Sequence, residues 1–263
     1  MKKLFLFATL LCASLSAFAA VQGKEVTYSA NGTTLKGYVA WDDAVKGSRP
    51  GMLVVHEWWG HNEYARKRAR MLAELGYTAL ALDMYGDGKQ AHHPDDAGKF
   101  AGEVAQNSEL ARARFNAALD LLKRENSVDA SRIGAIGYCF GGTVVMEMAR
   151  VGAPLKAVAS FHGMLSSKEA VPSGQVEARI RAYIGADDPF ISAAQMQTAR
   201  EVLEKSGADY QVTMYPGVKH SFTNPDADKY GKQFNLPLAY DAEADKASWE
   251  AMKAFLTETF AKK

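Results

Sequence analysis

The chain has 263 residues, of which 48% are hydrophobic and 23% are charged, as in a soluble globular protein built as one large domain. Its formal net charge is +1 at pH 7 and becomes −1 when residues 1–19, which carry Lys2 and Lys3, are removed. A chain so close to neutral has no electrostatic basis for binding nucleic acid or an anionic membrane surface, so both classes of partner are excluded.

The N-terminal segment has the form of a secretory signal peptide. The stretch MKKLFLFATLLCASLSAFAA begins with a lysine pair, continues with an apolar run that is short for a membrane span, and ends in the A-x-A site Ala17-Phe18-Ala19. We therefore predict a signal peptide over 1–19, a mature domain over 20–263 without a membrane anchor, and export to the periplasm or the exterior. Lipid attachment at Cys12 is the alternative, and the lack of a small residue just before it argues against this.

The mature chain begins with a predicted hairpin and continues as alternating strands and helices. KEVTYSA and TTLKGYVAW flank Asn31-Gly32, a pair that tolerates the positive φ angles of a tight turn. Apolar stretches then alternate with segments of helical periodicity in a βαβ rhythm. The further expected strands are 51–59, 77–85, 132–138, 155–163, 178–186 and 209–217, and the expected helices are 62–75, 112–125, one from Gly141, 191–206 and one from about Asp241.

This order of elements predicts an α/β fold. Its apolar strands require a mostly parallel central sheet with helices on both faces, preceded by the antiparallel N-terminal hairpin. The last helix repeats large apolar residues at a spacing of three or four, so it is expected to pack back on the domain. No repeat, linker or low-complexity segment divides the chain, and a monomer is expected.

The turn GYCFGG, residues 137–142, places a cysteine between a predicted strand and a predicted helix. Gly137-Tyr-Cys-Phe-Gly141 has the G-x-nucleophile-x-G form, in which the glycines permit a crowded turn that exposes the middle side chain. The N-terminus of the following helix favours the thiolate form of Cys139. The alternative is that Cys139, the only cysteine after residue 19, is a small apolar residue in a buried turn.

Two further residues support the nucleophile interpretation. Asp188 follows the strand ARIRAYIGA, and His220 follows the strand DYQVTMYPG. Nucleophile, acid and histidine therefore occur in the chain order of an α/β-hydrolase, each just beyond a strand end. Because the carboxyl ends of parallel strands lie at one edge of a sheet, we expect the three to meet.

Four motifs, HEWWG, GYCFGG, GADDPF and KHSF, make the chain resemble the dienelactone hydrolase family (carboxymethylenebutenolidases) over about residues 24–262. The resemblance implies an α/β-hydrolase fold without cofactor or metal, with Cys139 as nucleophile, Asp188 as acid and His220 as base. It also implies that Glu57 contacts the resting cysteine and swings away when substrate binds. The backbone N–H groups of Trp58 and Phe140 would form the oxyanion hole.

The substrate-binding pattern of that family is not reproduced. The family is expected to hold a substrate carboxylate with two arginines, but Asn224 stands at one of these positions and no arginine occurs between Arg70 and Arg112. Lys89, Lys99 or Lys219 could substitute as point charges, although lysine lacks the bidentate fork of arginine. The expected substrate pocket consists of Trp59, Tyr85, Phe222 and Asn224, which flank or replace the family's site residues.

Two motifs near residue 90 are interpreted as loop. Gly86–Ala91 matches G-x-G-x-x-A after a strand, but Pro94 and the preceding histidines interrupt any helix that would bind a dinucleotide there. His92 and His93, with Asp95 and Asp96, lack the i, i+4 spacing of a helical zinc site, so we expect a solvated loop ahead of a helix.

Three other features are given structural roles. RKRAR at 66–70 is expected to be a solvated helix face. His162 is the rival for the base, but it has no partner acid nearby in sequence, so it is expected to line the pocket. His56 is expected to be a buried residue at a strand end.

The sequence thus predicts an exported enzyme that cleaves a small-molecule ester or lactone through a thioester on Cys139. Activated esters and lactones are favoured over amides, because a thiolate leaves a tetrahedral adduct more readily than an amine does. A general carboxylesterase or thioesterase for neutral esters is the alternative that the missing arginines support. A thiol-redox protein, which would lack a resolving cysteine, and a ligand-binding protein remain open.

Overall fold

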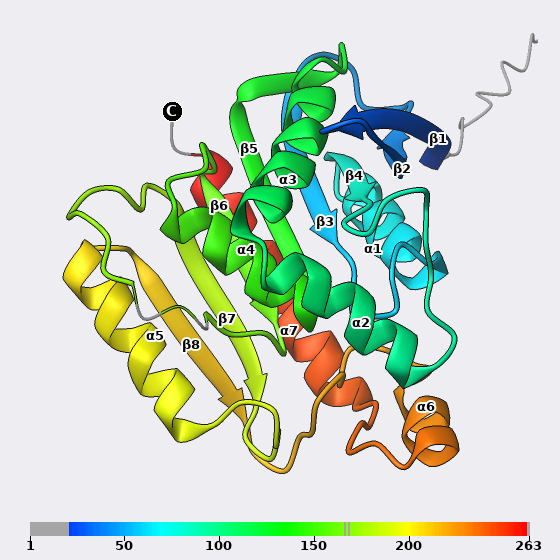
Figure 1. Ribbon diagram of the computed structural model, residues 1–263. Helices are drawn as coiled ribbons and strands as arrows, with labels where there is room; N and C mark the ends of the chain where they lie inside the picture. Colours follow the sequence, from blue (N-terminus) through cyan, green and yellow to red (C-terminus); the bar gives the residue numbers. More distant parts are fainter. Residues whose placement is uncertain (1–20, 166, 168, 262–263) are drawn as a thin grey trace, which may run out of the picture.

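The computed structural model describes residues 21–261 except 166 and 168, so the expected signal peptide and its cleavage site lie outside the described residues. Within that range, one eight-stranded sheet runs through the molecule in the order β1-β2-β4-β3-β5-β6-β7-β8 (Figure 1). The pairs from β4 to β8 are all parallel, whereas β1–β2 and β2–β4 are antiparallel. The strands are β1 (Val21–Ala30), β2 (Thr33–Asp42), β3 (Arg49–Val55), β4 (Thr78–Leu82), β5 (Val128–Tyr138), β6 (Ala157–Phe161), β7 (Arg179–Gly185) and β8 (Tyr210–Tyr215).

The N-terminal hairpin is confirmed, including its turn. Ala30 pairs with Thr33 across the two-residue loop, and Asn31 and Gly32 have φ angles of 50° and 78°. Both angles lie in the left-handed region that such a hairpin turn requires, which explains the Asn-Gly pair.

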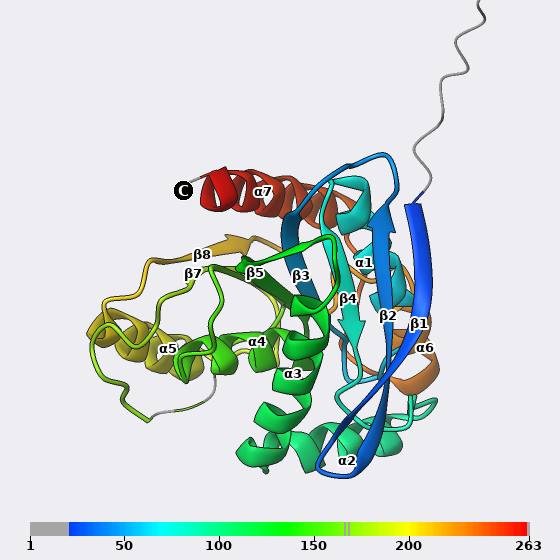
Figure 2. The ribbon, with the colours of Figure 1, turned by 90° about the horizontal axis from the view of Figure 1, so that it is seen from above.

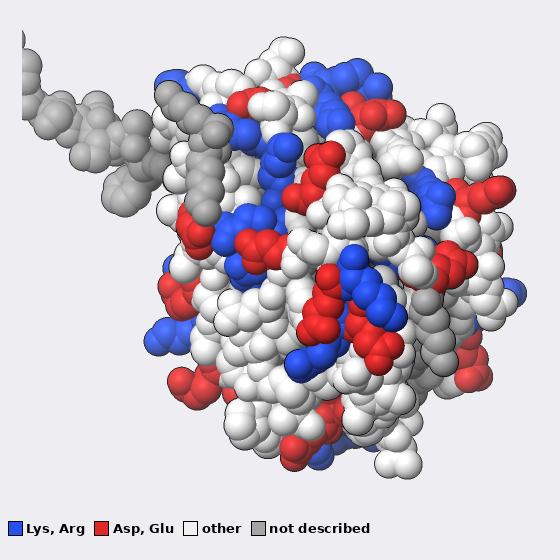
Figure 3. Space-filling model, turned by 90° about the vertical axis from the view of Figure 1, so that its left-hand side faces the viewer, with Lys and Arg blue, Asp and Glu red and all other residues white. Residues whose placement is uncertain are grey.

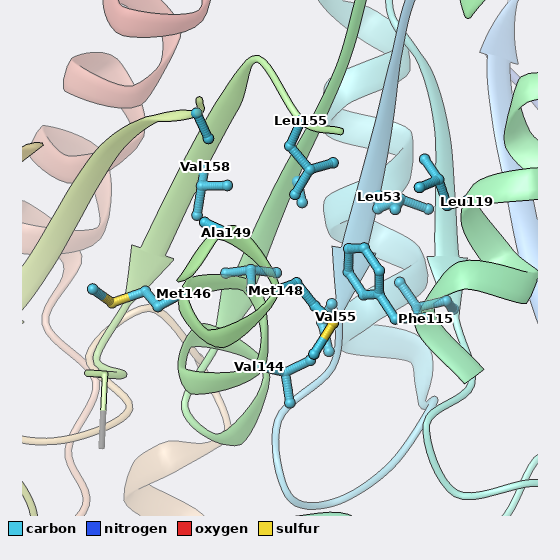
Figure 4. Close-up of a cluster of buried hydrophobic side chains, with 14 of the residues drawn as sticks. Leu53, Val55, Phe115, Leu119, Val144, Met146, Met148, Ala149, Leu155 and Val158 are labelled. Atoms are coloured by element: carbon cyan, nitrogen blue, oxygen red, sulfur yellow. The ribbon is translucent and has the colours of Figure 1, made fainter. Parts of the chain in front are cut away.

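Helices cover both faces of the sheet, as predicted, and each face has its own apolar core. Figures 1 and 2 show α2, α3, α4 and α5 on one face and α1 and α7 on the other. On the first face, Phe115 and Leu119 of α3 and Val144 and Met148 of α4 pack over Leu53 and Val55 of β3 (Figure 4). The helices are α1 (Glu63–Glu74), α2 (Pro94–Ala105), α3 (Ser108–Lys123), α4 (Phe140–Arg150), α5 (Ala193–Ser206), α6 (Ala227–Phe234) and α7 (Ala242–Ala261).

The expected loop ahead of a helix near residue 90 is confirmed, and the helix that follows is one whose bounds the sequence did not indicate. Helix α2 begins at Pro94, where the missing N–H costs no hydrogen bond, and His93 caps it by accepting from the Asp95 N–H. The preceding segment is a loop organised by Asp83, whose carboxylate accepts from the N–H groups of Tyr85, Gly86 and Gly88. Helix α6 is a second element that the periodicity of the sequence did not indicate.

The surface and the helices give two further findings. On the face drawn in Figure 3, basic and acidic side chains lie interspersed, in keeping with the near-neutral formal charge. None of the helices in the described range is both long and apolar enough to cross a lipid bilayer.

Candidate active site

The predicted site residues gather at one edge of the sheet. Glu57, Cys139, Asp188 and His220 come directly after β3, β5, β7 and β8, four parallel strands whose carboxyl ends point the same way. The topology therefore brings together residues that are far apart in the sequence.

Cys139 occupies a strained turn between β5 and α4. Its φ and ψ angles are 52° and −119°, a conformation that side-chain-bearing residues rarely adopt. The turn is closed by neighbouring glycines, since a Cβ on Gly137 would lie 2.1 Å from the carbonyl oxygen of Gly141. The turn leaves the Cys139 side chain partly exposed at the N-cap of α4, as the motif predicted.

A chain of two contacts links the cysteine to a buried carboxylate. The Nε2 atom of His220 lies 3.1 Å from Sγ of Cys139, and its Nδ1 atom lies 2.6 Å from Oδ2 of Asp188. The other carboxylate oxygen of Asp188 accepts from the Phe190 N–H, at 2.8 Å. Burial alone would lower the pKa of His220, but Cys139 and Asp188 outweigh it and raise that pKa to about 10. The arrangement therefore favours the imidazolium form of His220 beside the sulfur.

His162, the rival histidine, contacts the backbone of the nucleophile. Its Nδ1 atom accepts from the Cys139 N–H at 3.0 Å, so Nε2 carries the proton that Thr223 Oγ1 accepts at 2.7 Å. Burial lowers the pKa of His162 well below its usual value, and the charges of His220 and Arg68 lower it further. His162 is thus a neutral group that fixes the turn, and it also lines the cavity, as expected. His56 is fully buried at the end of β3, as expected.

Arg68 contradicts the expectation that residues 66–70 form a solvated face. It is 3% exposed, and its guanidinium donates to the Thr223 carbonyl at 2.7 Å and to the Asp245 carboxylate at 2.6 Å. The Tyr64 hydroxyl accepts from Arg68 Nε and lies 2.6 Å from Thr223 Oγ1. Because a buried cation must be paired, Arg68 holds the segment after His220 against α1 and α7.

Glu57 is buried and makes its hydrogen bond to Asn224 rather than to the cysteine. Its Oε2 atom accepts from Nδ2 of Asn224 at 2.5 Å, and no hydrogen bond of the described residues joins it to Cys139. Burial raises the pKa of Glu57, whereas the Asn224 hydrogen bond and the charges of His220 and Arg68 oppose that rise. The resting contact that the family resemblance implied is therefore not the arrangement in this structure.

Backbone donors lie on both sides of the cysteine. Phe140 is the first residue of α4, and Trp58 lies in the turn after β3. Neither of their N–H groups has a hydrogen-bond partner in the described part of the chain. Each is therefore available to a ligand oxygen.

A cavity of about 260 Å³ opens beside Cys139 and His220. Its wall is mostly apolar, and Phe190, which is 49% exposed, stands at its rim with its ring 4.9 Å from that of His220. The lining residues are Trp58, Cys139, Phe140, Thr143, His162, Gly163, Met164, Phe190, Ile191, Gln195, His220 and Leu238.

The four residues expected to line the substrate pocket do not belong to this wall. Trp59 is 2% exposed and stacks on Tyr230. The Tyr85 hydroxyl donates to the Trp58 carbonyl, Phe222 is fully buried beneath His162, and Asn224 binds Glu57. All four side chains contact neighbouring elements and do not face the cavity.

Among the described residues, which do not include Lys168, no lysine or arginine lines the cavity. Lys89, Lys99 and Lys219, the suggested substitutes for arginine, are exposed residues outside the cavity wall. The one cationic group among the described lining residues is His220, which is already paired with Asp188, so a carboxylate inside the cavity would be desolvated without an unpaired cation.

The sequence interpretation missed Thr143, Met164, Ile191, Gln195 and Leu238 as lining residues. Thr143 could have been found, because it lies one helical turn after the cysteine on α4. Leu238 could not, since it reaches the site through an isolated bridge to His220 that follows α6.

Comparison with protein-family models gives one match, the "Dienelactone hydrolase family", over residues 35–260. The chain is also similar to the protein usf of Aquifex pyrophilus, with 29% identity over 241 residues, 90% of this chain and 98% of that one. A putative carboxymethylenebutenolidase of Aquifex aeolicus is 29% identical over 77% of this chain and 87% of its own length.

Among solved structures, the chain resembles that of a dienelactone hydrolase-like promiscuous phosphotriesterase from metagenomic libraries. The two share 36% identity with a TM-score of 0.86, over 91% of this chain and 99% of that one. A putative dienelactone hydrolase from Klebsiella pneumoniae superposes with a TM-score of 0.72 at 24% identity, which supports the fold. The α/β-hydrolase fold expected from the sequence is confirmed.

Proposed function

Since this chain belongs to the dienelactone hydrolase family and is an ester or lactone hydrolase, we propose that Cys139, His220 and Asp188 carry out the cleavage. The observation that carries the proposal is the Asp188–His220–Cys139 chain of contacts, at 2.6 and 3.1 Å, beside the apolar cavity. A nucleophile, a base within reach of it and a group that orients the base form the set that acyl transfer needs.

The first half-reaction forms a thioester. The Cys139 thiolate attacks the carbonyl carbon, and the π electron pair moves to the carbonyl oxygen, which the Trp58 and Phe140 N–H groups would bind. When the adduct collapses, the carbon–oxygen bond of the ester breaks and the leaving oxygen takes the proton from Nε2 of His220. Asp188 keeps the imidazole oriented throughout.

The second half-reaction regenerates the enzyme. Neutral His220 takes a proton from a water molecule whose oxygen attacks the thioester carbon. The carbon–sulfur bond then breaks, so the acid is released and the thiolate–imidazolium pair is restored. With a lactone, the leaving oxygen stays on the acyl group and a single ring-opened product results.

The cavity favours neutral substrates over anionic ones. The described residues of its wall include no lysine or arginine, and an acyl group in it would contact the apolar residues Met164, Phe190, Ile191 and Leu238. Burying a carboxylate without a cation costs more than burying an alkyl group of the same size. We therefore propose activated esters and lactones without a charged acyl group as the substrate class, in preference to dienelactone carboxylates.

A matched pair of substrates tests this class. The mature enzyme is expected to hydrolyse p-nitrophenyl butyrate with a kcat/KM at least about tenfold higher than that for mono-p-nitrophenyl succinate, a difference of ~1.4 kcal/mol. The two acyl groups have the same number of carbons and differ in one terminal carboxylate. A dienelactone carboxylate, followed by its ultraviolet absorbance, completes the set. Faster turnover of the succinate or of the dienelactone would overturn the neutral class while leaving the hydrolase assignment in place.

A second candidate activity is the hydrolysis of neutral phosphotriesters. It is favoured by the 36% identical relative, whose description names that promiscuous activity, together with a mostly apolar cavity that suits a neutral phosphate ester. Diethyl p-nitrophenyl phosphate releases the same chromophore as the esters, so it is measured in the same assay. No release above the rate of the Cys139→Ala enzyme would exclude the activity.

We also propose that the protein acts outside the cytoplasm as a monomer. The support is the lysine pair, apolar run and A-x-A site at residues 1–19. The N-terminal residue of the protein recovered from its host, expected to be Ala20, tests export, and light scattering of that material tests the oligomeric state.

A further inference from the structure

Asn224 is held rigidly at the start of the segment after His220. Its side-chain Oδ1 atom accepts from the Asp226 N–H at 2.9 Å, and its own N–H donates to the Ser221 carbonyl at 2.9 Å. Its carbonyl accepts from the Ala227 N–H at 2.9 Å, at the beginning of α6. Because Oδ1 is already occupied by a donor, the amide can face Glu57 only with Nδ2.

Glu57 has few other partners. The residue is 2% exposed, its Oε2 atom accepts the 2.5 Å bond from Asn224, and Oε1 has no hydrogen-bond partner in the described part of the chain. The Ser221 side chain is a further polar neighbour that lowers the pKa of Glu57, but the Asn224 amide has the larger effect and is the main polar contact of this carboxyl group.

Resting on the nucleophile assignment above, we propose that Asn224 is a positioning residue that holds Glu57 away from Cys139 and leaves the cysteine paired with His220 before substrate arrives. In this structure, which contains no substrate, Sγ of Cys139 already contacts Nε2 of His220 at 3.1 Å. Activation of the nucleophile then needs no movement of Glu57.

Few of the groups around this pair change charge near neutral pH. The ionisable groups that surround the pair are Asp188 after β7, His162 after β6, Arg68 and Tyr64 on α1, Tyr85 after β4, Tyr138 on β5 and Tyr230 on α6. Burial raises the pKa of each of the four tyrosines and lowers that of His162, so the tyrosines and His162 stay neutral. Between pH 6 and 9, the ionisable groups left to act on the Cys139 sulfur are therefore chiefly His220 and Glu57.

Loss of the amide would release the carboxyl group. A carboxylate that approaches the sulfur would disfavour the thiolate, as like charges do, and would compete with the thiolate for the imidazolium. One pKa unit of such an effect corresponds to a tenfold change in the thiolate fraction.

The test is the rate at which iodoacetamide alkylates Cys139 in the full mature protein, measured from pH 6 to 9 without any substrate. The wild-type rate is expected to be nearly constant over this range, since only the thiolate reacts. Asn224→Leu, which keeps the approximate volume but cannot donate, is expected to react about tenfold more slowly at pH 7 and to gain a pH dependence. Absorbance of the thiolate near 240 nm should fall in parallel.

A double variant separates positioning from structural damage. Adding Glu57→Gln to Asn224→Leu removes the carboxylate and is expected to restore the wild-type rate and its flat profile, whereas a disrupted fold would not be rescued. Glu57→Gln alone is the matched control and is expected to keep the flat profile. An unchanged profile in Asn224→Leu, or a double variant as slow as the single one, would overturn the proposal.

Alkylation also distinguishes this inference from the proposed function, because it requires no ester turnover. If the reactivity of the thiolate depends on Asn224 but no ester is hydrolysed, the proposed function is wrong and the positioning role is supported. If hydrolysis depends on Cys139 but the alkylation profile of Asn224→Leu is unaltered, the proposed function is supported and the positioning role is wrong.

Discussion

Replacing Cys139 by alanine is expected to lower kcat/KM for p-nitrophenyl butyrate by about 10⁴-fold or more. The substitution removes the atom that forms the thioester, so only the backbone donors and the cavity remain to assist direct attack by water. The fold should persist, because the side chain is partly exposed and alanine keeps the same backbone turn. The measurement is steady-state release of p-nitrophenol by purified wild-type and variant enzymes.

Cys139→Ser is the control for this experiment. It retains a nucleophilic atom and the approximate volume, but a hydroxyl does not ionise near neutral pH as a thiol does. Its activity is therefore also expected to fall, while its midpoint of thermal unfolding stays close to that of the wild type. A Cys139→Ala enzyme with more than about one-tenth of the wild-type rate would show that another group carries the reaction.

Asp188→Asn is expected to lower kcat/KM by roughly 10³- to 10⁴-fold, by reversing the hydrogen bond to the histidine. Oδ1 of Asp188 accepts from the Phe190 N–H, so in the variant the amide oxygen would keep that place and the NH₂ group would face Nδ1 of His220. Nδ1 would then accept, Nε2 would carry the proton of the neutral ring, and His220 could no longer take a proton from thiol or water. The loss should appear in kcat as well as in kcat/KM.

Asp187 provides a matched control for that variant. It is the adjacent residue and has the same side chain, but it is exposed, whereas the Asp188 side chain is fully buried against His220. Asp187→Asn is expected to leave kcat/KM within about twofold of the wild type, as surface substitutions usually do. Equal losses in the two variants would argue against a specific role for Asp188.

The sequence predicted the parts of the site that depend on local patterns. A strand followed by G-x-C-x-G identified the turn at Cys139. The backbone approaches so closely there that a Cβ on Gly137 would clash with Gly141, so the turn requires glycine. Asp188 and His220, 32 residues apart, were placed together because both follow strands of a parallel sheet. The Asn-Gly pair identified the hairpin for a similarly local reason.

The environment of the site depends on contacts that no local pattern encodes. Arg68 reaches Thr223 and Asp245 across 155 and 177 residues, and Asn224 reaches Glu57 across 167. The charge pattern of residues 66–70 is typical of a solvated face, and only the packing of α1 against α7 makes Arg68 buried. The sequence interpreted Asn224 as a departure from the family pattern, but its partner depended on the turn that begins at Ser221.

The same long-range packing explains the error about the substrate pocket. Trp59 and Phe222 flank Glu57 and His220 in the sequence, but neighbouring residues of a strand-end turn point in different directions. Trp58 and His220 face the cavity, whereas Trp59 packs on Tyr230 of α6. Sequence proximity to a catalytic residue is therefore a weak guide to the lining of a cavity.

Acyl transfer through the sulfur of Cys139 requires a butyryl thioester, which mass spectrometry of the enzyme quenched during turnover detects. With p-nitrophenyl butyrate in excess, the wild-type protein is expected to gain the mass of one butyryl group. Peptide mapping should place that group on Cys139, and hydroxylamine should remove it as it does a thioester. A burst of p-nitrophenol with the acyl group on another residue, or full turnover by the Cys139→Ala enzyme, would show that the reaction does not pass through a thioester on Cys139.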